Sequence, residues 1–136
     1  MTVVLACGVF DLFHYGHLLH LQAARKLGDV LIVTVTADEA VNKGPGRPLF
    51  KVHQRMAIIR ALAIVDDVRP HTHIEEAIAQ IRPAIYTKGR EYEGRLPEQK
   101  LVESYGGRVV FTDDEVYSST QLIAGGYLQI PSVDSR

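Results

Sequence analysis

Short apolar runs alternate with amphipathic stretches along this chain. Four runs rich in β-branched and aliphatic residues predict strands at residues 2–7, 30–37, 84–89 and 108–113, and the short segment 66–70 is expected to form a fifth. Helical spacing of apolar residues predicts helices over 16–28, 51–64, 73–83 and 96–107, and hydroxyl residues suited to capping predict a last helix from Ser118. Strands that alternate with helices form parallel sheets covered by helices on both faces. The sequence therefore predicts an α/β fold with a five-stranded, mostly parallel sheet.

Glycine and proline mark the ends of several of these elements. Gly28 is expected to end the first helix, and Pro83 is expected to close the third. The segment 38–50 is predicted to be a loop because four of its residues disfavour regular structure, namely Gly44, Pro45, Gly46 and Pro48. The strand at 66–70 is short, and we expect it at an edge of the sheet.

Polar clusters follow three of the predicted strands. "GVFDLFHYGH" (8–17) follows the first strand, "KGREYEGR" (88–95) the fourth and "DDEVYSST" (113–120) the fifth. The carboxyl ends of parallel strands meet at one edge of a sheet, where ligands bind. The three clusters therefore predict one shared site.

His14 and His17 are the most informative residues of the first cluster. His17 lies near the first turn of a helix, where free N–H groups and the helix dipole favour an anion, and His14 can lie beside it. Two imidazole donors at this place suit a phosphate. A zinc site is the alternative, but the chain lacks the HExxH pattern and its one cysteine, Cys7, lies inside a strand. His20 continues the spacing without such a context, so we expect no role for it in the site.

Composition narrows the classes of function. The chain has 136 residues, 46% of them hydrophobic and 23% charged, which suits one globular domain. A formal net charge of -1 gives no general attraction to nucleic acid or an anionic membrane, so an anionic ligand needs local basic residues. One cysteine allows no intrachain disulfide, and no apolar run has the length of a signal peptide or a membrane span. We expect a cytoplasmic protein.

Several motifs together resemble those of a known family. "GVFDLFHYGH" matches the GxFDxxHxGH signature of the cytidylyltransferase-like nucleotidyltransferases at Gly8, Phe10, Asp11, His14, Gly16 and His17. "HQRMAIIRALAIVDDV" is similar to the family helix that carries an arginine, here Arg55, and "YSSTQLI" to its motif at the start of the last helix. The resemblance runs from residue 3 to about 124. It predicts a nucleotidyltransferase domain over 1–124, with 125–136 as a tail or the start of a linker.

The resemblance implies a Rossmann-like fold and transfer of a nucleotidyl group to a phosphorylated acceptor, with release of pyrophosphate. His14 and His17 would bind the triphosphate and stabilise the transition state, assisted by Lys43 and Arg55. Ser118, Ser119 and Thr120 would hold the β- and γ-phosphates. The other implied nucleotide-binding residues are Gly8, Val9, Phe10, Asp11, Gly16, Lys88 and Gly89. Mg²⁺ would come with the nucleotide, held through phosphate oxygens and water rather than by the protein.

The branch of the family that the chain resembles indicates which substrates to expect. The chain is closest to the branch of the ADP-heptose synthase adenylyltransferase domain and glycerol-3-phosphate cytidylyltransferase, and "YTKGREYEG" resembles the sugar-phosphate enzymes. Arg90 and Glu91 depart from the usual Gly-Asp, and "DDEVYSST" lacks the arginine of the glycerol-phosphate enzymes. The resemblance favours ATP and a sugar or polyol phosphate, with the acceptor bound by Arg47, Arg90 and Tyr92.

Two other functions stay open at this stage. One is a CTP-dependent cytidylyltransferase acting on a polyol or alcohol phosphate, and the other is a nucleotide-binding module without activity. An oxidoreductase is disfavoured because no GxGxxG follows the first strand. Family habit suggests a homodimer, and related domains are often fused to a sugar-kinase-like domain.

Overall fold

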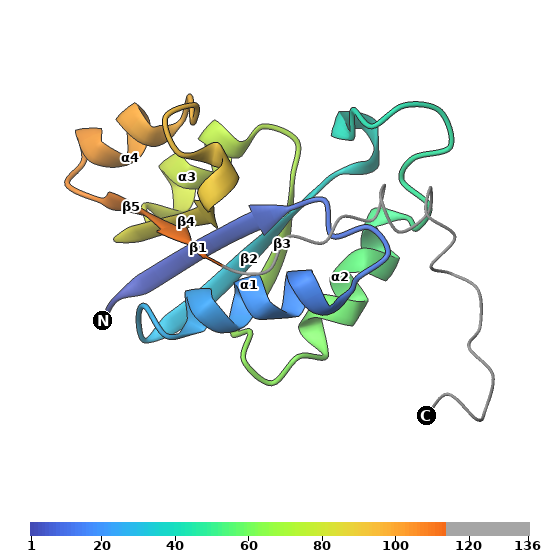
Figure 1. Ribbon diagram of the computed structural model, residues 1–136, viewed down its shortest axis with the longest axis horizontal. Coiled ribbons are helices and arrows are strands. Elements are labelled where there is room, and N and C mark those ends of the chain that lie inside the picture. Colours follow the sequence, from blue (N-terminus) through green and yellow to red (C-terminus); the bar gives the residue numbers. More distant parts are fainter. Residues whose placement is uncertain (114–136) are drawn as a thin grey trace.

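The computed structural model describes residues 1–113 (Figure 1). The strands are β1 (Val3–Gly8), β2 (Val30–Thr36), β3 (Asp67–His71), β4 (Ile85–Gly89) and β5 (Arg108–Thr112). The α-helices are α1 (Tyr15–Arg25), α2 (Val52–Arg60), α3 (Ile74–Ile81) and α4 (Gln99–Ser104), and two short 3-10 helices are η1 (Asp38–Ala40) and η2 (Arg90–Tyr92). The helix expected from Ser118 and the tail at 125–136 lie outside the described residues.

The five strands form one sheet in the order β3-β2-β1-β4-β5, and every pairing is parallel. β1 lies at the centre, and the reversal of strand order beside it brings β1 and β4 together. This arrangement confirms the α/β fold predicted from the sequence. β3 is an edge strand, as expected for the short segment, and an edge tolerates Pro70 because proline cannot donate to a neighbouring strand.

Each face of the sheet packs against its own pair of helices (Figure 1). Alternate residues of a strand point to opposite faces, so Val4 and Ala6 pack with Leu21 of α1 and Ile59 of α2. The opposite face carries Leu5, Ile32 and Tyr86, which pack with Ile78 of α3 and Val102 of α4. The central strands are buried on both faces, which is why they appear in the sequence as continuous apolar runs.

Gly28 has a different role from the one expected. α1 ends at Arg25, and Lys26 caps it with ordinary right-handed helical backbone. A Cβ at Gly28 would lie 2.7 Å from Val4 Cγ2 and 2.8 Å from the Thr2 carbonyl oxygen. Gly28 is therefore required by the close approach of this turn to the start of β1.

All four helices are shorter than the apolar spacing predicted, and at α2 and α4 apolar residues beyond the helix pack on the core. α2 ends at Arg60, and the chain then turns so that Leu62 and Ile64 pack against the core from outside the helix. α4 begins only at Gln99, although Leu96 is already buried in the core. At both places an apolar residue packs on the sheet without continuing the helix. Within residues 1–113, no helix is long and apolar enough to cross a membrane.

Candidate active site

α1 begins with a capping box formed by two histidines. His14 is the N-cap residue, and its Nδ1 accepts a hydrogen bond from the Gly16 N–H at 3.1 Å. His17 reaches back, and its Nδ1 accepts from the His14 backbone N–H at 3.2 Å. The two rings are stacked, with centroids 3.8 Å apart. The side chains expected to bind phosphate thus also satisfy backbone donors at the start of the helix.

Both imidazoles are uncharged at neutral pH. Burial lowers the pKa of His17 to about 3, helped by its electrostatic interactions with His14, His20 and Lys43 and opposed by Asp11. Burial also lowers the pKa of His14 below its usual value. The exposed Lys43 therefore lies close enough to His17 to act on its pKa. The histidines therefore offer N–H donors, and Lys43 offers the positive charge.

The turn between β1 and α1 holds unusual backbone geometry. Phe10 and Leu12 have φ angles of 52° and 53°, a left-handed conformation that non-glycine residues adopt rarely and at some cost. The Phe10 ring packs edge-on to His17, with centroids 5.4 Å apart. A Cβ at Gly8 would lie 3.1 Å from that ring. Gly8 thus leaves room for the aromatic ring that supports the imidazole.

Asp11 fastens this turn to the 38–50 segment. Its carboxylate accepts from Arg47 Nε at 3.0 Å, the Leu49 N–H at 2.7 Å and the Phe50 N–H at 3.1 Å. Burial raises the pKa of Asp11, but these hydrogen bonds and the Arg47 charge outweigh it and hold the pKa below its usual value. Both Asp11 and Arg47 therefore have internal partners. Among residues 1–113, no group of three or more His, Cys, Asp or Glu could hold a metal ion.

Arg55 is the most enclosed charged side chain of the region, with 1% of its surface exposed. Its guanidinium donates to the carbonyl oxygens of Val9 (2.8 Å), Thr36 (2.7 Å) and Phe50 (2.9 Å). It also pairs with Asp38 at 2.7 Å. The sequence predicted a phosphate ligand at this position. In the structure Arg55 instead joins the end of β1, the end of β2 and the start of α2, and a phosphate would have to displace these partners.

A second group of polar residues lies at the end of β4, on the sheet face that α3 and α4 cover. The Lys88 ammonium is largely enclosed, 3.7 Å from Cys7 Sγ and 4.3 Å from the centroid of the Tyr92 ring. Burial lowers the pKa of Lys88, but Cys7, Tyr92 and Glu98 together raise it above its usual value. Lys88 is therefore charged, and within residues 1–113 it forms no ion pair with a carboxylate.

The short segment after β4 is exposed. Arg90 forms ion pairs with Asp113 and, at 3.1 Å, with Glu93. Tyr92 is 38% exposed, and Arg95 also lies over its ring at 5.6 Å. The Glu91 carboxylate, which departs from the family pattern, folds back over Gly89.

Two further histidines contact residues at strand ends. His20 Nδ1 is 3.0 Å from Thr112 Oγ1, which links α1 to the end of β5. His71 Nε2 is 3.2 Å from Thr36 Oγ1, and burial with the charge of Lys88 lowers the pKa of His71 to about 4. Sequence reasoning assigned His20 no role in the site and did not single out His71. The one feature that could have pointed to His71 is its position at the carboxyl end of a strand.

The structure places the residues that the sequence predicted for one site in two groups, one beside the β1–α1 turn and one at the end of the neighbouring strand β4. One group lies on the side of α1 and α2 and comprises the residues of the β1–α1 turn with Lys43, Arg47 and Arg55. The other lies at the end of β4 and comprises Lys88, Gly89, Arg90 and Tyr92. Ser118, Ser119 and Thr120 lie outside the described residues.

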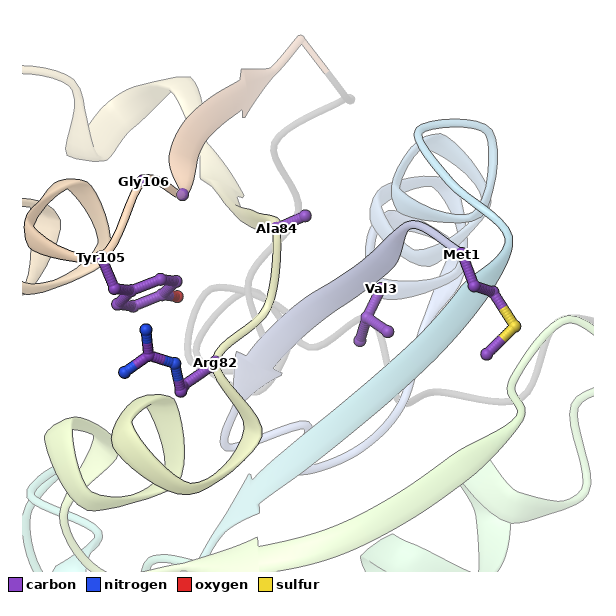
Figure 2. Close-up of a pocket in the computed structure, with 7 residues that line it drawn as sticks. Met1, Val3, Arg82, Ala84, Tyr105 and Gly106 are labelled. Carbon is purple, nitrogen blue, oxygen red and sulfur yellow. The ribbon is translucent and has the colours of Figure 1, made fainter.

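A cavity of about 310 Å³ lies away from both groups, at the amino-terminal ends of the strands (Figure 2). Met1, Val3 and Ala84 line it at the strand starts, and the Arg82 guanidinium stacks on the Tyr105 ring at 4.8 Å. The Tyr105 hydroxyl donates to the Pro83 carbonyl oxygen at 2.8 Å. This cavity shares no residue with the histidine turn or with the β4 segment.

A sheet of this order, with paired histidines on the turn after its central strand, defines a class of nucleotide-binding α/β domains. The chain belongs to the cytidylyltransferase-like family, whose model matches residues 5–124. This confirms the resemblance found in the sequence.

Two relatives show which proteins of the family this chain is similar to. The chain is 40% identical over 129 residues to a D-beta-D-heptose 1-phosphate adenylyltransferase of Bordetella bronchiseptica, covering 90% of this chain and 80% of the relative. It is 44% identical over 131 residues to the bifunctional protein HldE of Streptomyces coelicolor, covering 90% of this chain but only 28% of that protein. The chain thus spans about a quarter of the bifunctional relatives.

Solved structures agree with the fold. A lipopolysaccharide core biosynthesis protein from Thermoplasma volcanium is 30% identical with a TM-score of 0.70, covering 87% of this chain and 99% of the other. A pantoate-beta-alanine ligase from Francisella tularensis shares the fold at 13% identity, with a TM-score of 0.64 over 87% of this chain and 61% of the other.

Proposed function

We propose that this protein transfers AMP from ATP to a sugar phosphate and releases pyrophosphate. The observation that carries the proposal is the pair of uncharged, stacked histidines at the start of α1, at the sheet edge that also holds Lys43 and Lys88. The name of the relative from Bordetella bronchiseptica supports adenylyl transfer to a heptose 1-phosphate in particular.

The chain's own residues would act by binding and positioning the reactants. An oxygen of the acceptor phosphate forms a bond to the α-phosphorus of ATP while the bond from that phosphorus to pyrophosphate breaks. Imidazole N–H donors of His14 and His17 would stabilise the charge that builds up on the phosphoryl oxygens. The Val9 and Phe10 backbone would approach the α-phosphate, and Lys43 would neutralise the triphosphate. No covalent intermediate with the protein is needed.

The acceptor would bind on the other side of β1, at the end of β4. Lys88 carries an enclosed ammonium that contacts a sulfur atom and an aromatic ring, so a phosphate oxygen would be a stronger partner. This assigns Lys88 to the acceptor phosphate, whereas the sequence placed it with the nucleotide. Tyr92 would flank the sugar. Arg47 and Arg90 would contact the acceptor only by exchanging their ion pairs with Asp11 and Asp113.

Other properties follow from the family and belong to the same proposal. Mg²⁺ would reach the site with ATP and neutralise its phosphates, because the described residues provide no metal site of their own. Ser118, Ser119 and Thr120 would hold the outer phosphates. We also propose a cytoplasmic homodimer that works with a sugar-kinase-like domain, fused or separate, since the bifunctional relatives are much longer than this chain.

The test is pyrophosphate release from ATP or CTP with a panel of sugar 1-phosphates, including heptose 1-phosphate, and polyol phosphates. We expect turnover with ATP and a sugar phosphate. Turnover only with CTP and a polyol phosphate would replace the proposal with a cytidylyltransferase. ATP binding in a thermal-shift assay without turnover on any acceptor would identify a nucleotide-binding module instead.

A further inference from the structure

The capping box of α1 restricts the chemistry that its two histidines can perform. We propose that His14 and His17 work as neutral imidazoles that carry their single proton on Nε2, and that the helix cap fixes this tautomer in both. The inference rests on the proposed function for its chemical consequence, but the tautomers themselves can be tested on the protein alone.

Two backbone N–H donors fix the tautomers of the two rings. The Gly16 N–H points at His14 Nδ1 and the His14 N–H points at His17 Nδ1, at 3.1 and 3.2 Å. A backbone N–H can only donate, so each Nδ1 must present a lone pair. A neutral imidazole has one proton, and it must then be on Nε2. The other tautomer would place N–H against N–H at both contacts and remove both caps.

The surroundings of the rings oppose a second proton. The groups that act on His17 are His14 and His20 on its own helix, Lys43 in the loop and Asp11 in the preceding turn, and three of these four disfavour a cation. The His14 and His17 rings are stacked at 3.8 Å, and Phe10 and Phe13 pack against His17. Protonation would therefore add a charge in a partly buried aromatic cluster and break a cap at the same time.

This state defines what the histidines contribute to the reaction. Each has one N–H, on Nε2, to donate to a phosphoryl oxygen, and neither Nδ1 is available to accept a proton. The acceptor phosphate attacks as an anion and pyrophosphate leaves as an anion, so no proton needs to pass through an imidazole. The positive charge that the triphosphate requires would come from Lys43 and from the Mg²⁺ that accompanies the nucleotide.

The direct test is a long-range ¹H–¹⁵N NMR correlation of the histidine rings between pH 5 and 8. His17 is expected to show an unprotonated Nδ1 and a protonated Nε2 throughout, and His14 the same pattern at pH 8, assigned by the single variants described next. A protonated Nδ1 in either ring at pH 8, or an imidazolium signature of His17 above pH 5, would overturn the proposal. Because this measurement needs no substrate, its outcome is independent of whether the protein transfers AMP.

Paired variants separate the cap from the donor. His14→Asn keeps an oxygen acceptor suited to the N-cap, and His17→Gln keeps the usual reciprocal partner of a capping box, but both lose the imidazole. His14→Ala and His17→Ala lose the cap as well. We expect all four to lose turnover at least a hundredfold, while only the alanine variants lower the melting temperature, by about 3–6 °C.

Two results would contradict this assignment. If the alanine variants melted like the cap-preserving variants, the histidines would not cap α1 in solution and their tautomers would be unrestrained. If His14→Asn and His17→Gln kept turnover near the unaltered level, the imidazoles would have a purely structural role. In a protein without transferase activity, the melting temperatures would still decide the first point.

Discussion

The two sides of the candidate active site are built in different ways. On the side of α1 and α2, Asp11 and Arg55 are almost fully buried and tie the β1–α1 turn to the loop before α2. At the end of β4, Arg90 and Tyr92 are exposed, and Arg90 is held by surface ion pairs. Buried hydrogen-bonded charges are costly to disrupt, whereas exposed ion pairs contribute little. Substitutions at the β4 end can therefore change what is bound without endangering the fold.

This difference fits the division of substrates in the proposed reaction. A triphosphate is the same for every acceptor, so a rigid histidine turn suits it. The acceptor varies between branches of the family, and this chain departs from the usual Gly-Asp at Arg90 and Glu91, within the exposed segment. If this division holds, substitutions on the side of α1 and α2 lower the stability of the fold, and substitutions at the end of β4 change the binding of the acceptor.

The largest effect is expected from Arg55→Met. This variant leaves the Asp38 carboxylate and three carbonyl oxygens without their common donor, and removal of one partner from a buried ion pair costs about 3–5 kcal/mol. Urea denaturation should show this loss of the free energy of unfolding. Arg60→Met, in the exposed last turn of α2, is the control and should change it by less than about 0.5 kcal/mol. A normally stable Arg55→Met variant with lost ATP binding would instead make Arg55 a phosphate ligand.

Asp11→Asn should have the next largest effect, and this effect should depend on pH. Hydrogen bonds lower the pKa of Asp11 in the folded protein, so its carboxylate stabilises the fold above the pKa of the unfolded chain and loses this effect as the pH falls through the folded pKa. Hydrogen bonds to a charged group are worth about 1.5–3 kcal/mol, so we expect a loss of that order at pH 7. Denaturation at a series of pH values should show the difference from the unaltered protein shrinking below about pH 4. A difference that stayed constant to pH 2 would show that the carboxylate charge does not matter.

The contrast also explains which features could be predicted from the sequence. The strands were predictable because a parallel sheet buried on both faces needs continuous apolar runs, and the pairing of His14 with His17 followed from their spacing at a helix start. The ends of α2 and α4 could not be predicted, since Leu62 and Leu96 pack on the core from outside a helix. The partners of Arg55 and Asp11 lie up to 46 residues away, and such contacts depend on the folded chain. An arginine that follows a polar loop looks the same in the sequence whether it binds a phosphate or hydrogen-bonds to groups of its own chain.

Lys88→Met tests the acceptor side. If Lys88 holds the acceptor phosphate, the variant loses a charge-assisted hydrogen bond worth about 1.5–3 kcal/mol, or roughly ten- to a hundredfold in binding. Steady-state kinetics should show this as a raised KM for the sugar phosphate with little change in the KM for ATP. Lys100→Met, at an exposed position of α4, is the matched control. An increase confined to the KM for ATP would return Lys88 to the nucleotide, as the sequence suggested.

The smallest effect is expected at Tyr92. Its ring lies 4.3 Å from the Lys88 ammonium at a partly exposed position, where a cation–π contact contributes about 0.5–1 kcal/mol. Tyr92→Phe keeps the ring and should leave the KM for the sugar phosphate unchanged, whereas Tyr92→Ala should raise it about two- to fivefold. Neither variant should alter the urea midpoint appreciably, because the ring covers the site from the exposed side. If Tyr92→Ala instead unfolded as easily as Arg55→Met, the β4 end would be as firmly built as the histidine turn, and the distinction between the two sides would not hold.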